Sequence, residues 1–322
     1  MIDETTLYRV AELYYIQGAT MEAVADRLSV SRSTVSRMLQ TARDRGIVRI
    51  SLSTPMNTRS ELAQTLSDTF GVTAHVAGTS ASASDARRLE AAARYAAVLV
   101  SDRFGNGMTL AVAWGITTSA VASYLQPKRT QDTTVVQMNG AVSARAPQMG
   151  HSPELLAEMA AAFGSSLIPF PTPAFFDNEQ TRRLMWAESS VRRVLSVRNS
   201  ADLALFSVGA FQGSTRSEVY SGGYLTEDAF KQFAAHRVVG DVCTVFLRED
   251  GTYADIDLNR RASGPTPMEL RQIPSRLCVV AGDQKVPGLV GALRAGVVTD
   301  LVIDEITART LMRRINPLTK DA

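Results

Sequence analysis

The chain of 322 residues has few of the residues that build metal sites, disulfide frameworks or membrane spans. Its two cysteines, Cys243 and Cys278, each lie in an apolar run, which favours buried reduced thiols in strands over a disulfide. Its three histidines are scattered, with no pair at metal-ligand spacing. No apolar run approaches the ~20 residues of a membrane span, and no secretory leader opens the chain. We expect a cytoplasmic protein without a cofactor, a metal site or a membrane partner.

The chain also lacks a strong excess of charge of either sign. Its 34 Lys and Arg residues nearly balance 32 Asp and Glu residues, for a net charge of +2. Such a protein does not coat nucleic acid as a polycation does, so any affinity for DNA must come from a local basic patch, doubled by oligomerisation. The length suggests two domains, and 45% apolar residues are enough for a sizeable core.

Residues 20–46 predict two short helices joined by a tight turn. Thr20 is a good N-cap for the first helix, which ends near Ser29, and Ser31 caps the second, which Gly46 stops. The apolar residues recur at helical spacing and give each helix one buried side. They are Ala23, Val24 and Leu28 in the first helix and Val35, Met38, Leu39 and Ala42 in the second.

The opposite face of the second helix has no carboxylate in its first two turns. It carries short donors and guanidiniums, namely Ser31, Arg32, Ser33, Thr34, Ser36 and Arg37. The second helix of a helix-turn-helix enters the major groove, where its first residues reach bases and phosphates. We therefore expect these residues to contact double-stranded operator DNA, with Arg37 and Arg32 reading bases. An ordinary solvated helix pair is the alternative.

The segments around this helix pair complete a small all-α domain. A helix over 4–17 precedes the pair, and its Tyr14 and Tyr15 either reach DNA phosphates or serve only in the core and at its rim. Residues 47–52 alternate like a strand, so a winged form stays open. Residues 53–57 resemble a linker. We place a DNA-binding domain at 1–54 and an effector and oligomerisation domain at 55–322.

The larger domain alternates strand-like and helix-like stretches, which predicts an α/β fold. Continuous apolar strands indicate a sheet covered on both faces. Expected strands lie at 72–76, 108–113, 134–138, 203–208, 277–281 and 300–303, and expected helices at 85–104, 179–197, 286–294 and 305–314, with others from 117 and 153. Residues 248–251 indicate a hairpin between 242–246 and 252–256.

Three short segments of this domain carry candidate ligand-binding chemistry. Residues 114–119 pass from a strand through glycine to hydroxyls and a helix, which offers backbone N–H groups to an anion. Residues 282–285 repeat this arrangement and add Lys285. Asp241, at an expected strand start, suits sugar hydroxyls. Each has a plain alternative, respectively a capped turn, a solvated lysine and a carboxylate that caps a turn.

Five blocks of sequence resemble the SorC-type, or DeoR/CggR-like, sugar-binding transcriptional regulators of bacteria. They are residues 29–52, 111–121, 135–142, 238–251 and 281–305, and the resemblance extends over nearly the whole chain. It implies an effector domain with the fold of sugar-phosphate isomerases, which binds a phosphorylated sugar or polyol without converting it, in a protein that is usually tetrameric.

The resemblance also implies roles for single residues. Gly115, Thr117 and Thr118 match the loop that cradles the phosphate, Lys285 matches the lysine that assists it, and Asp241 matches the acid that holds hydroxyls. Some members hold deoxyribose phosphate through a lysine Schiff base, and Asn139 stands where that amine would be sought. A hydrogen bond from Asn139 to a ligand hydroxyl is therefore expected, with a turn-forming asparagine as the alternative.

Two other classes of function have less support. A sugar-phosphate isomerase or lactonase needs a general base, and the sequence shows neither a suitable histidine nor a clear acid pair. A recombinase or partition protein needs strand-transfer or nuclease chemistry. We predict a non-enzymatic, sequence-specific regulator of a carbohydrate catabolic operon that assembles as a dimer or tetramer.

Overall fold

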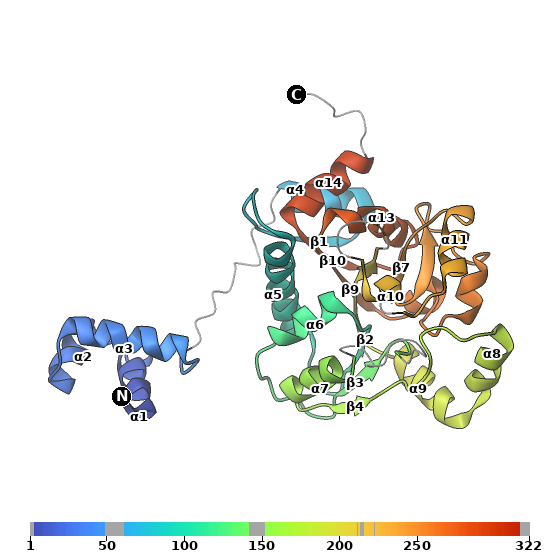
Figure 1. The fold of residues 1–322 in the computed structure, drawn as a ribbon. Helices are drawn as coiled ribbons and strands as arrows, with labels where there is room; N and C mark the ends of the chain where they lie inside the picture. The colour runs from blue at the N-terminus through green and yellow to red at the C-terminus, as the bar shows by residue number, and fades with distance from the viewer. Residues whose placement is uncertain are drawn as a thin grey trace. The chain divides into compact units, whose positions relative to one another are not determined.

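The computed structural model describes residues 3–48, 61–141, 152–210, 212, 216–221 and 223–315. The chain divides into two compact units, Met1–Met56 and Asn57–Ala322 (Figure 1). Among the helices of the described residues, none is both long enough and apolar enough to cross a membrane.

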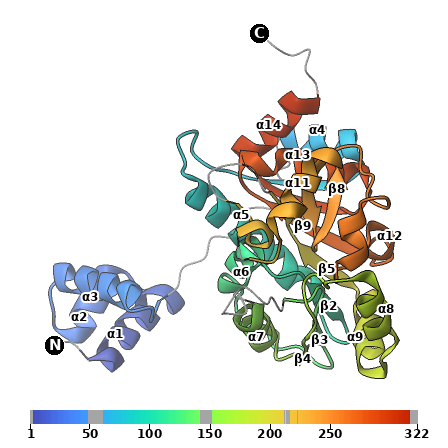
Figure 2. The same cartoon turned by 45° about the vertical axis from the view of Figure 1, so that its right-hand side comes forward.

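The N-terminal unit is built from three helical segments around a small core (Figure 2). α1 (Glu4–Ala11) continues into the π-helical turn η1 (Glu12–Ile16), and α2 (Met21–Leu28) and α3 (Arg32–Asp44) follow. Thr20 and Ser31 cap α2 and α3, since their hydroxyls accept from the backbone N–H groups of Ala23 (3.1 Å) and Thr34 (3.2 Å). Of the proposed wing only residues 47 and 48 are described, and neither is in a strand; residues 49–57 lie outside the described part.

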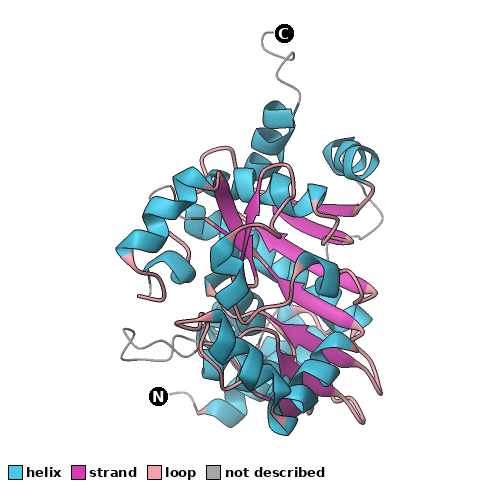
Figure 3. Ribbon diagram, turned by 90° about the vertical axis from the view of Figure 1, so that its right-hand side faces the viewer, coloured by secondary structure: helices cyan, strands magenta, loops and turns pink. Residues whose placement is uncertain are grey.

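The second unit is α/β, as the alternating pattern predicted, and its main sheet is parallel (Figure 3). In the described residues its spatial order is β1 (Thr73–Ala77), β10 (Asp300–Asp304), β9 (Ser275–Val280), β5 (Leu203–Phe206), β2 (Thr109–Val112), β3 (Thr134–Gln137) and β4 (Ser166–Ile168). Every neighbouring pair is parallel. Because parallel strands point the same way, all loops that follow them meet at one edge of the sheet.

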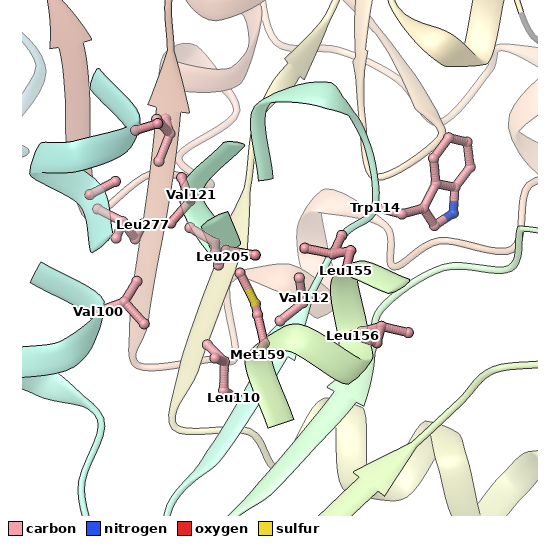
Figure 4. Close-up of a cluster of buried hydrophobic side chains, with 14 of the residues drawn as sticks. Val100, Leu110, Val112, Trp114, Val121, Leu155, Leu156, Met159, Leu205 and Leu277 are labelled. Carbon is pink, nitrogen blue, oxygen red and sulfur yellow. The ribbon is translucent and has the colours of Figure 1, made fainter. Parts of the chain in front are cut away.

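Alternate residues of each strand bury against helices on opposite faces of the sheet. Leu110 and Val112 belong to one core, with α5 (Asp85–Arg103), α6 (Ile116–Ser123) and α7 (Ser152–Phe163). Figure 4 shows this core, including Val121 and Met159. Ala111 belongs to the core on the other face, which is covered by α4 (Glu61–Phe70), α9 (Ser189–Asn199), α13 (Val286–Arg294) and α14 (Glu305–Ile315).

A small antiparallel sheet of β6 (Val208–Gly209), β7 (Val238–Val242) and β8 (Val245–Arg248) packs against α13. This packing requires glycine, because a Cβ on Gly288 would lie 2.6 Å from Val208 Cγ1, and one on Gly240 would lie 2.5 Å from the Gly209 carbonyl oxygen. The sheet is antiparallel, as expected for part of this region.

The hairpin predicted at 248–251 is wrong in position. The chain reverses at Cys243 and Thr244, which both have positive φ (51° and 71°), and residues 252–256 form no strand. Thr244 donates its backbone N–H to Asp241 Oδ2 (3.0 Å), which stabilises a turn that has no glycine or asparagine to mark it. Cys243 is therefore in a turn rather than a strand, and Asp241 is inside β7 rather than at its start, whereas Cys278 lies in β9 as predicted.

The single long helix predicted at 179–197 is also wrong. It is two helices, α8 (Glu179–Ala187) and α9, separated at Glu188, whose ψ of 136° is extended. No glycine or proline marks this break. Several short elements carry no prediction at all: α10 (Glu218–Ser221), α11 (Glu227–Ala235), α12 (Pro267–Leu270), η2 (Asp257–Arg261) and η3 (Asp283–Lys285).

Candidate functional site

The candidate site lies where the order of the parallel strands changes direction. From β2 the chain continues to β3 on one side, whereas from β5 it continues, through the small sheet, to β9 on the other. Ligands of open α/β sheets bind beyond the carboxyl ends of strands at such a point. A cavity of about 290 Å³ is found here. It is lined by every residue that the sequence analysis assigned to the effector: Gly115, Thr117, Thr118, Asn139, Asp241 and Lys285.

One end of this cavity gathers groups that can hold an anion. Lys285 Nζ donates to Thr117 Oγ1 (2.9 Å) and Ser207 Oγ (3.0 Å), which joins the loops that follow β9, β2 and β5. Gly115 has a φ of 142°, a conformation that other residues rarely adopt, and α6 begins immediately after it. The first N–H groups of a helix have no intrahelical acceptor and carry partial positive charge. We call this arrangement of Gly115, Thr117, Ser207 and Lys285 the anion end.

Burial disfavours the charged forms of Lys285 and Asp241, which both line the cavity. It lowers the pKa of Lys285 to about 8, although the nearby Asp241 opposes the change. It raises the pKa of Asp241 to about 6, against hydrogen bonds from Tyr220 and from the backbone N–H of Thr244. The two groups favour each other's charged form, and a ligand anion beside Lys285 would strengthen its ammonium further.

We expect inorganic phosphate to bind the anion end less tightly as pH rises through about 8. Lys285 begins to lose its proton there in the free protein, whereas a bound anion raises its pKa. Between the free and bound pKa values, each pH unit should reduce affinity by up to about tenfold. Phosphate titrations from pH 7 to 10 measure this, with Lys285→Met as the variant that should not show the decline. A flat wild-type profile would mean that the ammonium does not meet the anion.

The Asn139 side chain supplies an unpaired acceptor elsewhere in the cavity wall. Asn139 is 2% exposed, and its Oδ1 has no hydrogen-bond partner among the described residues. Its backbone is held firmly, because Gln137 Nε2 donates to the Asn139 carbonyl (2.8 Å) and Trp114 Nε1 to the Gly140 carbonyl (2.9 Å). A fixed, buried acceptor without a donor suits a ligand hydroxyl.

Several lining residues were missed from the sequence, including Asp85, Ser207, Arg216 and Glu218. Trp114 and Gln284 also line the cavity; they lie in the candidate segments 114–119 and 282–285 but were given no role of their own. Ser207 directly follows β5, so the rule that ligands lie beyond strand ends could have found it. Arg216 lies two residues before the short helix α10, and Glu218 is its first residue. No periodic pattern in the sequence predicts this helix. Arg216 is exposed and adds a second cation to the cavity wall.

The candidate DNA-contacting residues gather at the start of α3. Arg32, Ser33, Ser36 and Arg37 are exposed, as an approach to DNA requires. Arg32 pairs with Glu22 at 3.4 Å, but both side chains are more than two-thirds exposed, so the pair is weak and easily exchanged for phosphate.

The remaining candidates for DNA contact have structural partners. Ser31 Oγ lies 2.8 Å from the hydroxyls of Ser33 and Thr34, in addition to capping the helix. Tyr14 and Tyr15 are half-buried and pack edge to face, with ring centroids 5.0 Å apart. The hydroxyl of Tyr15 accepts from Arg43 Nη1 at 3.4 Å. Contact of these residues with DNA stays a prediction.

Comparison with known proteins agrees with this architecture. Residues 54–313 match the family described as "Putative sugar-binding domain". The chain is 30% identical over 303 residues to the deoxyribonucleoside regulator of Bacillus subtilis (strain 168), covering 94% of this chain and 95% of that one. It is 26% identical over 315 residues to the sorbitol operon regulator of Klebsiella pneumoniae, covering 97% and 98%.

Solved structures give the same result. A domain of a possible sugar-binding transcriptional regulator from Arthrobacter aurescens TC1 has a TM-score of 0.74 at 39% identity, covering 80% of this chain and 99% of that one. The full-length sorbitol operon regulator of Klebsiella pneumoniae has a TM-score of 0.71 at 26% identity, covering 96% and 98%. These relatives are named as regulators and not as enzymes. The chain therefore belongs to the SorC-type family of sugar-binding transcriptional regulators, as the five sequence blocks predicted.

Proposed function

We propose that this regulator binds operator DNA through α3 and is controlled by a phosphorylated sugar or polyol, and that it governs a carbohydrate catabolic operon. The observation that carries the proposal is the contact of Lys285 with Thr117 and Ser207 at the start of α6. A cation, hydroxyls and a helix N-terminus in one place are the groups that proteins use to hold phosphate.

The rest of the cavity suits the other part of such a ligand. Asn139 presents a buried acceptor, and the carboxyl groups of Asp85, Glu218 and Asp241 also line the wall. Acceptors of this kind bind ligand hydroxyls, which donate hydrogen bonds. A cavity of about 290 Å³ is at the lower limit of the range typical for small-molecule sites, about 300–1,000 Å³. A single phosphorylated sugar or polyol unit fits this combination of size and chemistry.

Thermal-shift screening tests the effector half of this proposal. Phosphorylated pentoses, hexoses and hexitols are compared with the same compounds without phosphate. A ligand at a hundredfold excess over its Kd should stabilise the protein by about 2.7 kcal/mol. The proposal expects stabilisation by at least one phosphorylated compound and much less by its unphosphorylated partner. Stabilisation by unphosphorylated sugars alone would remove the phosphate from the proposal.

The DNA half of the proposal treats α2 and α3 as a helix-turn-helix. Its basic residues are few, and the net charge of the chain is only +2. Because affinity for DNA grows with the number of phosphates neutralised, one such unit makes a weak complex at physiological salt. We therefore propose that a homo-oligomer, a dimer or a tetramer, places two of these units on two half-sites.

This assembly leads to a direct expectation for DNA binding. Light scattering should show at least a dimer, and an operator with two half-sites should bind far more tightly than a fragment that contains one. Moving the half-sites apart by half a helical turn should abolish this advantage, because the second α3 would then face away from its groove. A monomer that binds one half-site tightly at physiological salt would contradict the proposal.

A further inference from the structure

A buried arginine outside the cavity lies behind the loop that carries Lys285. Arg88, in the first turns of α5, is 6% exposed. Its guanidinium donates to Asp283 Oδ1 (2.6 Å), Thr307 Oγ1 (2.7 Å), Asp304 Oδ1 (2.9 Å) and Asp85 Oδ1 (3.3 Å). Arg88 thus joins α5, the loop after β9, the end of β10 and the start of α14.

Two of these contacts act on the loop over 282–285. Asp283, two residues before Lys285, receives the shortest of them. Thr307 Oγ1 also accepts from the backbone N–H of Gly282 (2.8 Å), so Arg88 orders the acceptor that holds the first residue of the loop. The loop is therefore tied on the side that faces away from the cavity. On the cavity side its lysine reaches Thr117 and Ser207.

The helix that carries Arg88, α5, also forms part of the cavity wall. Asp85, Ala86 and Leu89 line the cavity, whereas Arg88 does not. The Arg88 side chain binds Asp85 and Asp283, which belong to two segments of the cavity wall, without lining the cavity itself. Planar and forked, a guanidinium holds several acceptors in fixed directions, which an ammonium cannot do.

We propose that Arg88 is a positioning residue for Lys285. It fixes the 282–285 loop so that the ammonium stays at the anion end, and it thereby sets the affinity for phosphate without touching it. This inference rests on the proposed function, because that proposal is what assigns phosphate to Lys285. The contact of Arg88 with Asp283 forms without any ligand. The positioning role and the proposed function can therefore be tested separately.

The choice of variant follows from burial. Arg88→Ala would leave Asp304, which is 0% exposed, as a buried carboxylate without its cation, a change that strongly destabilises the fold. Asp283 is safer, because its side chain is 48% exposed. Asp283→Ala removes the direct tie between Arg88 and the loop, and it leaves the contacts of Arg88 with Asp304 and Thr307 in place. Asp283→Asn keeps an oxygen acceptor for Arg88 and serves as the conservative rescue.

Asp255→Ala is the matched control. Asp255 also binds an arginine at 2.6 Å, Arg248, and its side chain is 74% exposed. Like Asp283 it does not line the cavity, but it lies outside the 282–285 loop. A general effect of losing one exposed aspartate and its ion pair would appear in both variants. An effect through the 282–285 loop would appear in Asp283→Ala alone.

Two measurements on the full-length protein decide the inference. Hydrogen exchange without ligand should be faster over 282–286 in Asp283→Ala and unchanged in Asp255→Ala. Titration with inorganic phosphate should show affinity about tenfold weaker in Asp283→Ala, partly restored in Asp283→Asn and unchanged in Asp255→Ala, a loss typical of one charge-assisted contact. Unchanged exchange over 282–286 in Asp283→Ala would overturn the inference, and so would unchanged phosphate affinity beside faster exchange.

The proposed function fails in a different way. If wild type and Lys285→Met respond equally to phosphate, the anion end is wrongly assigned. The exchange measurement then still decides whether Arg88 positions the loop, because faster exchange in Asp283→Ala supports the tether and unchanged exchange refutes it.

Discussion

Replacing Lys285 with methionine is expected to weaken binding of a phosphorylated sugar or polyol by about ten- to a hundredfold, while the unphosphorylated compound loses little. Charge-assisted hydrogen bonds contribute roughly 1.5–3 kcal/mol, and about 1.4 kcal/mol is a factor of ten. Methionine keeps most of the length of the side chain, so the change removes the ammonium at the anion end without opening a large cavity. Calorimetry with both compounds on both proteins measures the difference.

Affinity for DNA without a ligand should barely change in this variant. An effector shifts the balance between DNA-binding and non-binding states only by its different affinities for them, so damage to the cavity removes the response and spares the basal state. Lys231→Met is the matched control, because Lys231 is exposed and pairs only with Asp228 (3.0 Å) among the contacts described. Equal losses for the phosphorylated and unphosphorylated compounds would show that Lys285 does not meet the phosphate.

Replacing Arg37 with alanine is expected to weaken binding to the specific operator by about 1–3 kcal/mol for each α3 that reads DNA, and to relax the preference for one base pair. Arg37 is exposed on α3, and the buried side of that helix carries Val35, Met38 and Leu39, so the variant should fold normally. DNA titrations with single-base operator variants measure both effects, and a thermal melt checks the fold.

A lysine at the same position separates charge from recognition. Arg37→Lys keeps the positive charge but loses the forked pair of donors that can bridge two acceptors on guanine. It should therefore bind non-specific DNA like wild type and still lose preference at one base pair. Arg9→Ala, an exposed arginine of α1, controls for loss of charge alone. Wild-type affinity and preference in Arg37→Ala would mean that this residue is not a reader.

The sequence predicted the elements whose signals are local. Thr20 and Ser31 were predicted to cap helices because each stands just before residues with helical apolar spacing, where a hydroxyl can accept from a free backbone N–H group. The structure has both caps. The α/β fold followed from apolar strands that alternate with helices. Loops after parallel strands share one edge, which brings together Gly115, Thr117, Thr118, Asn139 and Lys285, and Asp241 lines the same cavity from β7. Their roles in binding stay predictions.

Tertiary contacts explain the wrong prediction of the turn. At Cys243 and Thr244 the chain turns because Asp241 accepts the backbone N–H of Thr244 and surrounding residues bury the turn, so tertiary contacts replace the glycine or asparagine that a local rule requires. At Glu188 the predicted helix is interrupted although no glycine or proline marks the position. The positions of Arg216 and Arg88 depend on long-range packing. Arg88 binds Asp283 and Asp304, which lie 195 and 216 positions away in the sequence, and no spacing rule can predict such a contact.

The central claim is that occupation of the cavity changes binding of DNA. Fluorescence anisotropy of a labelled operator tests it most directly, with wild type and Lys285→Met titrated in the presence and absence of the phosphorylated compound that stabilises wild type most. The account predicts a change in wild-type operator affinity within the usual range of allosteric coupling, about 5- to 150-fold, and in Lys285→Met an unchanged basal affinity with little or no response at the same concentration. The account would be contradicted if the wild type bound the operator equally tightly with and without that compound, at a concentration that saturates the cavity.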